Sequence, residues 1–327
     1  MRVSFAKDAF VVGAVAYDPK VVTIWEGFRT WFGTQGLAFD YVLFSNYERQ
    51  VQALLDGEIH VAWNSPLAWI ETERAAARRG KRAKAIAMRD TDCDLTSVVV
   101  VRADSPIRTV ADLRARTVAV GASDSPQATL IPLVHIRGES GLAPGIDFEV
   151  RRNEVMVGMH GDHVGGEREA ARQLVAGEVD AACMIDGNHL AFSREGTLPK
   201  GATRVLSQTG LYDHCNFTVL EGVAEQACHR FTELLLAQRY DDAAVRPLLD
   251  LEGLKAWKEG RTNGYALLNA AVDAFGTIDD FLGGSSPPPP PAGEPGTRRF
   301  AALPVGQARD PEPEPFLSPK REGGGGG

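Results

Sequence analysis

Residues 39–69 read FDYVLFSNYERQVQALLDGEIHVAWNSPLAW, and this stretch decides the fold. Its first six residues, Phe39–Phe44, have the aromatic and apolar composition of a buried strand. Tyr47–Asp56 carries apolar residues three and four positions apart, which predicts an amphipathic helix, and Gly57 is placed to end it. Residues 59–63 return to strand composition. A strand, a helix and a second strand in this order favour parallel pairing.

The same alternation continues on both sides of this stretch. Pro66 suits the first turn of a helix that runs to about residue 79, with Asn64 or Ser65 as its cap. Further strands are expected at residues 2–5, 85–88 and 97–102. Residues after the first strand, including the apolar run 10–16, are interpreted as a loop. The rhythm predicts an α/β fold of mostly parallel sheets with helices on both faces.

A second strand–helix series begins near Ser105. Its strands are expected at residues 117–120, 148–151 and 179–184, and its helices after 123–126, at 165–176 and at 188–194. Strands at 204–208 and 216–220 are expected to return to the first unit, followed by helices at 224–237, 241–251 and 266–275. The chain is expected to leave the first lobe near residue 103 and to return to it near residue 203. These two crossings would form a hinge between the lobes. The predicted division is 1–102 for the first lobe, 103–203 for the second, 204–283 for the return, and 284–327 for a disordered tail.

The composition narrows the possible partners. The chain has 327 residues and a formal net charge of −8 at pH 7. Nucleic acid and anionic membranes need a clustered basic face, so the acidic balance excludes both as main partners. No apolar run approaches the length of a membrane helix, which argues against membrane insertion. The N-terminus lacks the features of a signal peptide, so a cytoplasmic location is expected, or a periplasmic one if a leader was removed.

Three segments carry a family resemblance: residues 47–66, with ALLDGEIHVAWNSPLAW; residues 99–132, VVVRADSPIRTVADLRARTVAVGASDSPQATLIP; and residues 160–180, with GEREAARQLVAGEVDAA. The sequence resembles the phosphate/phosphite/phosphonate-type substrate-binding proteins of ABC transporters, which have the type 2 periplasmic-binding-protein fold. The resemblance implies a two-lobed protein that binds a small anionic solute in a cleft between its lobes. It also implies an ABC transporter permease as a partner, no enzymatic activity and no cofactor.

The sequence departs from this family at the anion-binding loop. The family reads Ser-Thr-Ser-Gly there, whereas this chain reads Ser125-Pro126-Gln127-Ala128. Two hydroxyl donors are lost and one amide is gained. The departure weakens the expectation of phosphate or phosphonate and leaves a carboxylate, a sulfonate or a mixed ligand open.

Candidate ligand-binding residues lie at predicted strand ends. Residues 123–129 lie between a strand and a helix, where free N–H groups and the helix dipole favour an anion. Ser125, Gln127 and Thr129 add side-chain donors there, although Ser123 or Ser125 would also serve as a simple helix cap. The first-lobe candidates are Tyr17, Asn46, Tyr47 and Ser65. Their rings would pack against the ligand and their polar groups would bind its head group, with capping and loop packing as the alternative.

A histidine cluster is the remaining polar feature. The candidates are His160, Asp162 and His163, with Asp186, His189, His214 and Cys215 in segments that can share the site. His, Asp and Cys are ligands of zinc and iron, but the spacing is not that of a helical histidine pair. We assign His160, Asp162, His163 and Asp186 to ligand binding and none to a metal, with solvated loop groups as the alternative.

The sequence contains no recognisable catalytic nucleophile motif, P-loop or dinucleotide fingerprint. The leading hypothesis is therefore a solute-binding protein. The alternative is a cytosolic enzyme of small-molecule metabolism on the same fold. The several histidines and the lack of signal-peptide features favour this alternative.

Residues 284–327 combine a proline run, scattered charges and five terminal glycines without any apolar period. Such a composition buries too little apolar surface to offset the entropy of ordering. We expect that deleting residues 284–327 leaves the melting temperature unchanged, as measured by differential scanning calorimetry. A large drop in melting temperature would mean that the tail packs on the body of the protein.

Overall fold

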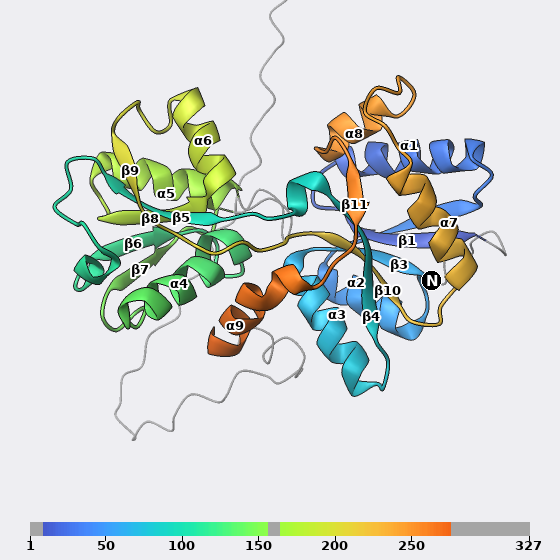
Figure 1. Ribbon diagram of the computed structural model, residues 1–327, viewed down its shortest axis with the longest axis horizontal. Coiled ribbons are helices and arrows are strands. Elements are labelled where there is room, and N and C mark those ends of the chain that lie inside the picture. The colour runs from blue at the N-terminus through green and yellow to red at the C-terminus, as the bar shows by residue number, and fades with distance from the viewer. Residues whose placement is uncertain (1–8, 156–163, 276–327) are drawn as a thin grey trace, which may run out of the picture. The chain divides into compact units, whose positions relative to one another are not determined.

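The computed structural model describes residues 9–155 and 164–275, and Figure 1 draws the remainder as thin grey traces. The chain divides into two compact units, residues 1–284 and 285–327, and all described residues belong to the first. The strand expected at residues 2–5 and the tail expected from residue 284 therefore lie outside the described residues.

Two sheets organise the described chain, and Figure 1 shows each with its own helices. The first sheet has the order β11-β4-β10-β3-β1-β2. Its strands are β1 (Phe10–Val15), β2 (Phe39–Phe44), β3 (Val61–Asn64), β4 (Ala83–Arg89), β10 (Asn216–Leu220) and β11 (Trp257–Glu259). β1 pairs in parallel with β2 and β3, and β10 lies antiparallel between β3 and β4. Consequently β1, β2, β3 and β4 all run in one direction.

The second sheet repeats this plan with the order β7-β6-β8-β5-β9. Its strands are β5 (Ser97–Arg102), β6 (Thr117–Val120), β7 (Glu149–Arg152), β8 (Ala181–Ile185) and β9 (Thr203–Gln208). β6 pairs in parallel with β7 and β8, and β5 lies antiparallel between β8 and β9. The α/β class with two sheets is confirmed, but the pairing is mixed rather than mostly parallel. In each sheet one strand, β10 or β5, runs antiparallel to both of its neighbours.

The strand pairing also places the chain crossings between the two sheets at other residues than the sequence predicted. Ser97–Arg102 and Thr203–Gln208 pair with each other in the second sheet, so the chain crosses at residues 90–96 and 209–215 rather than near residues 103 and 203. The two crossings run beside each other, since Leu95 and Tyr212 form an antiparallel bridge. Local composition identified both strands but could not specify their partners.

Helices cover both faces of each sheet, as expected. They are α1 (Lys20–Thr34), α2 (Tyr47–Asp56), α3 (Pro66–Arg78), α4 (Ile131–Ser140), α5 (Val164–Ala176), α6 (Asp186–Glu195), α7 (Glu225–Leu236), α8 (Arg246–Glu252) and α9 (Ala266–Phe275), with short turns η1 (Asp90–Asp92), η2 (Val110–Leu113), η3 (Pro126–Leu130) and η4 (Asn263–Tyr265). Alternate residues of β1 serve the two faces: Phe10 and Val12 pack in one apolar cluster with α1 and α7, and Val11 packs in another with α2.

The interpretation of residues 10–16 as a loop is wrong, because Phe10–Val15 forms β1. This strand lies between β2 and β3, and all six of its residues are buried. A central strand that is covered on both faces is apolar throughout. This explains why the sequence FVVGAV shows no alternation of apolar and polar residues. Helix α1 and strand β11 were also not expected from the sequence.

The packing of α5 against the second sheet depends on a glycine. A Cβ added at Gly166 would lie 2.6 Å from the Asn153 carbonyl oxygen and 3.3 Å from the Gly121 Cα. Both neighbours are backbone atoms of the segments that follow β7 and β6. Helix α5 can therefore approach these segments closely only with glycine at this position.

We expect Gly166→Ala to lower the free energy of unfolding by about 1–3 kcal/mol, because the added methyl group overpacks this contact. Gly138→Ala in α4 is the matched control, since a Cβ there meets nothing within 4 Å. It should raise the free energy of unfolding by up to about 1 kcal/mol through helix propensity. Urea titration measures both variants, and equal effects would show that α5 has room to move.

Candidate functional site

The candidate site forms at one edge of the first sheet, here called the first edge. Because β1, β2, β3 and β4 run in one direction, the segments that follow them lie at the same edge. Strand β10 runs the opposite way, so the residues that precede it lie at this edge too. The first edge therefore collects Tyr17, Asn46, Tyr47 and Ser65, which the sequence predicted, and Arg89, Asp92, His214 and Cys215.

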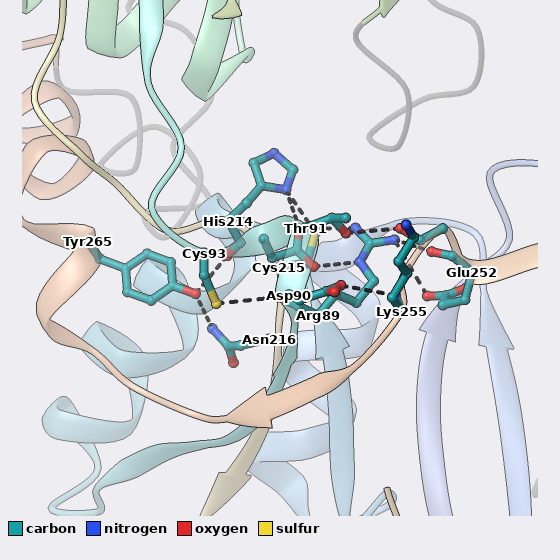
Figure 2. A network of polar contacts seen from close by, with 12 residues as sticks. Arg89, Asp90, Thr91, Cys93, His214, Cys215, Asn216, Glu252, Lys255 and Tyr265 are labelled. Carbon is teal, nitrogen blue, oxygen red and sulfur yellow. Dashed lines mark hydrogen bonds and ion pairs between the residues drawn. The ribbon is translucent and has the colours of Figure 1, made fainter. Parts of the chain in front are cut away.

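An ion pair between Arg89 and Asp92 anchors the first edge. Arg89 Nε donates to Asp92 Oδ2 at 2.5 Å, and its Nη2 donates to Oδ1 at 3.0 Å. The remaining Nη1 donates to the Glu252 carbonyl oxygen at 2.8 Å, as Figure 2 shows. The guanidinium also lies over the Trp63 ring, 5.2 Å from its centroid. Since Asp92 is only 2% exposed, both charges are held in a fixed geometry.

His214 connects this ion pair to strand β10, which begins two residues later. Its Nδ1 lies 3.3 Å from Asp92 Oδ1 and 3.2 Å from Cys215 Sγ. The His214 backbone N–H donates to the Asp92 carbonyl oxygen at 2.8 Å, and its own carbonyl accepts from the Tyr265 hydroxyl at 2.6 Å. Figure 2 shows the imidazole projecting from this network. Both the backbone and the side chain therefore fix the position of the ring.

The charges of the first edge stabilise one another. Burial alone would raise the pKa of Asp92, but Arg89 and His214 hold that pKa at about 2. Burial alone would lower the pKa of His214, but the neighbouring Cys215 and Asp92 raise it to about 10. Burial raises the pKa of Glu252 to about 6, although Arg89 opposes the rise. Asp92 therefore stays ionised across the neutral range, and the positive charges of Arg89 and His214 compensate it.

The four first-lobe candidates differ in their roles. Asn46 caps α2 by accepting from the Arg49 N–H at 2.9 Å, and Ser65 caps α3 by accepting from the Ala68 N–H at 3.3 Å. Tyr47 is buried, and burial raises its pKa well above the usual value, with Cys215 and Tyr17 near enough to add to the rise. Tyr17 packs against the apolar cluster that contains Cys215, whereas Tyr47 belongs to the cluster on the other face of the sheet. Ligand contacts of these four residues stay a prediction.

The predicted loop of the second lobe is held by its own side chains. Ser125 Oγ accepts from the Ala128 N–H at 3.2 Å, and the Thr129 hydroxyl donates to the Ala122 carbonyl oxygen at 2.7 Å. The Gln127 carbonyl oxygen accepts from the Ser97 hydroxyl at 2.5 Å. Ser125 is therefore a helix cap for η3, one of the two expected roles. Its contact with a ligand stays a prediction, as do those of Gln127 and Thr129.

A buried carboxyl group lies next to this loop. Glu167 Oε2 accepts from the Ile185 N–H at 2.9 Å and from Asn188 Nδ2 at 3.0 Å. Burial raises the pKa of Glu167 to about 7, and hydrogen bonds from Asn188 and Ile185, a hydrogen bond from Gln127 and the charge of His214 oppose the rise only in part.

Asp186 begins α6 and has partners of its own. Its Oδ2 accepts from the Thr96 hydroxyl at 2.8 Å, and its Oδ1 accepts from the Gly187 N–H at 2.6 Å. The sequence grouped Asp186 and His189 with His214 and Cys215, but the three ligand-bearing side chains that the structure brings together are Asp92, His214 and Cys215. His160, Asp162 and His163 lie outside the described residues.

Arg89, Asp92 and Glu167 were missed from the sequence. An arginine that ends a strand, with an aspartate three residues later, was the available signal for the first two. Glu167 lies within the quoted segment 160–180, but nothing in its surroundings there indicates burial. Only the fold brings Arg89 and Asp92 to His214 and buries Glu167 against Ile185 and Asn188.

A family model described as "ABC transporter, phosphonate, periplasmic substrate-binding protein" matches residues 12–265. No curated protein matches the chain. Within the described residues, the helices lack the length and apolar character needed to cross a membrane.

Solved structures share the fold at low sequence identity. PhnD1 from Prochlorococcus marinus, solved with methylphosphonate, is 14% identical with a TM-score of 0.60, covering 83% of this chain and 99% of that one. A Xanthomonas citri protein bound to ATP is 16% identical with a TM-score of 0.60, covering 84% and 99%. A phosphonate-transporter binding protein from Pseudomonas aeruginosa is 13% identical with a TM-score of 0.53, covering 85% and 89%. The type 2 periplasmic-binding-protein fold is thereby confirmed.

The raised pKa of Glu167 makes stability depend on pH. Between its ordinary value of 4.5 and about 7, the unfolded chain loses the Glu167 proton while the folded protein keeps it. The stabilisation is full below pH 4.5 and is lost as the pH rises to about 7, by up to about 3 kcal/mol. We expect Glu167→Gln to remove this loss. Urea titrations at pH 5 and pH 7 measure it, and an unchanged difference between the two would contradict a protonated Glu167.

Proposed function

Because this chain belongs to the phosphonate-type periplasmic substrate-binding proteins of ABC transporters, we propose that it binds a small organic oxyanion between its two sheets and presents it to a permease. The observation that carries the proposal is the extent of the family match, residues 12–265, which includes both sheets and the whole first edge. We infer that the protein acts by binding rather than by catalysis, and that it acts in the periplasm.

The charges near the first edge support an anionic ligand. The chain has a net charge of −8, which would repel an anion if unpaired carboxylates lined the site. Here Arg89 neutralises Asp92 through two hydrogen bonds. Glu167 keeps its proton up to about pH 7, since burial raises its pKa to that value. Below about pH 7, Asp92 and Glu167 therefore add little net negative charge.

The aromatic residues support an organic rather than an inorganic anion. Tyr17 follows β1 and Tyr47 follows β2, so both tyrosines lie at the first edge. Aromatic rings after two neighbouring strands would offer apolar surface for a carbon substituent, and the loop after β6 would offer N–H groups for the charged end. We propose that Tyr17 and Tyr47 pack against the carbon substituent, that Asn46 and Ser65 line its path, and that Ser125, Gln127, Thr129 and Asp186 surround the head group.

The loop sequence selects among oxyanions. Pro126 and Ala128 stand where the family has a hydroxyl residue and a glycine, and Gln127 replaces another hydroxyl residue. Fewer hydroxyl donors satisfy fewer oxygen lone pairs, which favours a singly charged sulfonate or phosphonate monoanion over a phosphonate dianion. PhnD1 was solved with methylphosphonate, so that compound is a suitable member of a test series.

Isothermal titration calorimetry with methylphosphonate, methanesulfonate, acetate and inorganic phosphate tests the proposal. We expect one of the two organic tetrahedral anions to bind most tightly and to raise the melting temperature, because a ligand that binds only the folded state stabilises it. Failure of all four to bind at millimolar concentration would contradict the proposed ligand class.

Two substitutions separate ligand contact from folding. Gln127→Ala should weaken the binding of the most tightly bound anion by about 1–3 kcal/mol if the Gln127 amide contacts the ligand. Ser125→Ala should lower the free energy of unfolding by about 0.5–2 kcal/mol through loss of the η3 cap, whether or not it weakens binding. Gln35→Ala, at an exposed position after α1, is the control and should change neither. Unchanged affinity in both loop variants would remove this loop from the site.

A further inference from the structure

Three side chains at the first edge carry atoms that bind metal ions. Asp92 offers a carboxylate oxygen, His214 offers Nδ1 and Cys215 offers Sγ, and these atoms all lie within 4.8 Å of one another. Asp92 and Cys215 are buried, whereas the His214 side chain is 19% exposed. The group is thus mostly enclosed by protein and accessible from the side of the imidazole.

The geometry of the trio differs from that of a catalytic relay. In a relay of thiol, imidazole and carboxylate, the thiol and the carboxylate bond to opposite nitrogens of the ring, so that a proton passes through it. Here the Asp92 carboxylate and the Cys215 sulfur both approach the same nitrogen, Nδ1, at 3.3 Å and 3.2 Å. One nitrogen has one lone pair or one proton and cannot serve both partners as a relay.

The same convergence suits a single cation. Zinc bound to imidazole nitrogen at about 2.05 Å, carboxylate oxygen at about 2.1 Å and thiolate at about 2.3 Å separates the tetrahedral ligands by about 3.4–3.6 Å. The Nδ1–Oδ1 separation of 3.3 Å and the Nδ1–Sγ separation of 3.2 Å are within a few tenths of an ångström of those values. The third separation, between an Asp92 carboxylate oxygen and Cys215 Sγ, is within 4.8 Å, and side-chain movement would bring it to the tetrahedral value.

The surrounding residues hold the three ligands in place. Arg89 fixes the Asp92 carboxylate through both of its oxygens, and each oxygen keeps a further lone pair for another partner. The Tyr265 hydroxyl donates to the His214 carbonyl oxygen, and the Asn216 amide donates to that hydroxyl at 2.8 Å. Such outer contacts orient the ligands of metal sites. The positive charge of Arg89 opposes a cation, so the thiolate and the imidazole must supply most of the affinity.

We propose that Asp92 Oδ1, His214 Nδ1 and Cys215 Sγ bind one Zn²⁺ or a similar borderline-soft divalent cation. A thiolate and an imidazole favour zinc or cobalt over magnesium and calcium, which prefer oxygen ligands. Thiol and imidazole protons are released to solvent as the metal–sulfur and metal–nitrogen bonds form, and no ligand is oxidised or reduced. Three protein ligands leave a fourth position for water or another small ligand. The proposal does not depend on which anion the protein binds.

Cobalt(II) titration of the reduced, metal-stripped, untagged full-length protein tests the site. We expect one equivalent of Co²⁺ to produce thiolate-to-cobalt charge-transfer absorption in the near ultraviolet, and one equivalent of Zn²⁺ to abolish it. This measurement needs no variant. An absence of the absorption at saturating Co²⁺, or its persistence with excess Zn²⁺, would overturn the proposal.

Two variants assign the absorption to its ligand. Cys215→Ser should abolish the charge-transfer band and weaken Co²⁺ binding by at least about tenfold. Cys228→Ser is the matched control, because Cys228 is also a buried thiol but donates to the Val223 carbonyl oxygen outside the trio. It should keep the band. Circular dichroism establishes that both variants fold, and a band that survives Cys215→Ser or disappears in Cys228→Ser would overturn the assignment.

Discussion

One arginine holds the two chain crossings side by side by binding a carboxylate on each. Arg261 Nε donates to Asp213 Oδ2 at 2.7 Å, and its Nη2 donates to Asp213 Oδ1 and to Asp94 Oδ1, both at 2.6 Å. Asp213 lies on one crossing and is 2% exposed, and Asp94 lies on the other. A buried carboxylate with one partner removed is costly, so this contact strongly favours the paired crossings.

The paired crossings also determine which residues meet at the first edge. Asp92 ends the short turn at the start of one crossing, and His214 lies near the end of the other. The backbone hydrogen bond from His214 to Asp92 continues the pairing that the Leu95–Tyr212 bridge begins. Side chains far apart in the sequence are thereby brought into contact by main-chain geometry. Arg89 and Cys215 are positioned by the two strands that flank this pairing.

The sequence predicted local elements well where their signals are local. Tyr47–Asp56 begins at the Asn46 cap and ends at Gly57 in the left-handed conformation, so both boundaries were readable from single residues. The insertion of β10 between β3 and β4 was not predictable, because strand direction and partner depend on long-range packing. The same reason explains the site. Tyr17 and Tyr47 follow strands and could be expected at an edge, whereas Asp92 meets His214 only through the crossings.

The inserted strands have a consequence for protein synthesis. Every strand of the second sheet comes from one continuous stretch, residues 97–208, whereas the first sheet needs β10 and β11 from residues 216–259 to join strands made much earlier. On the ribosome, the second sheet can close first. Until residue 259 has left the exit tunnel, the aromatic face formed by Phe10, Phe28 and Phe32 lacks Phe217, Phe231 and Trp257, which cover it in the folded protein. Exposed apolar surface of this kind makes a nascent chain prone to aggregation during the interval.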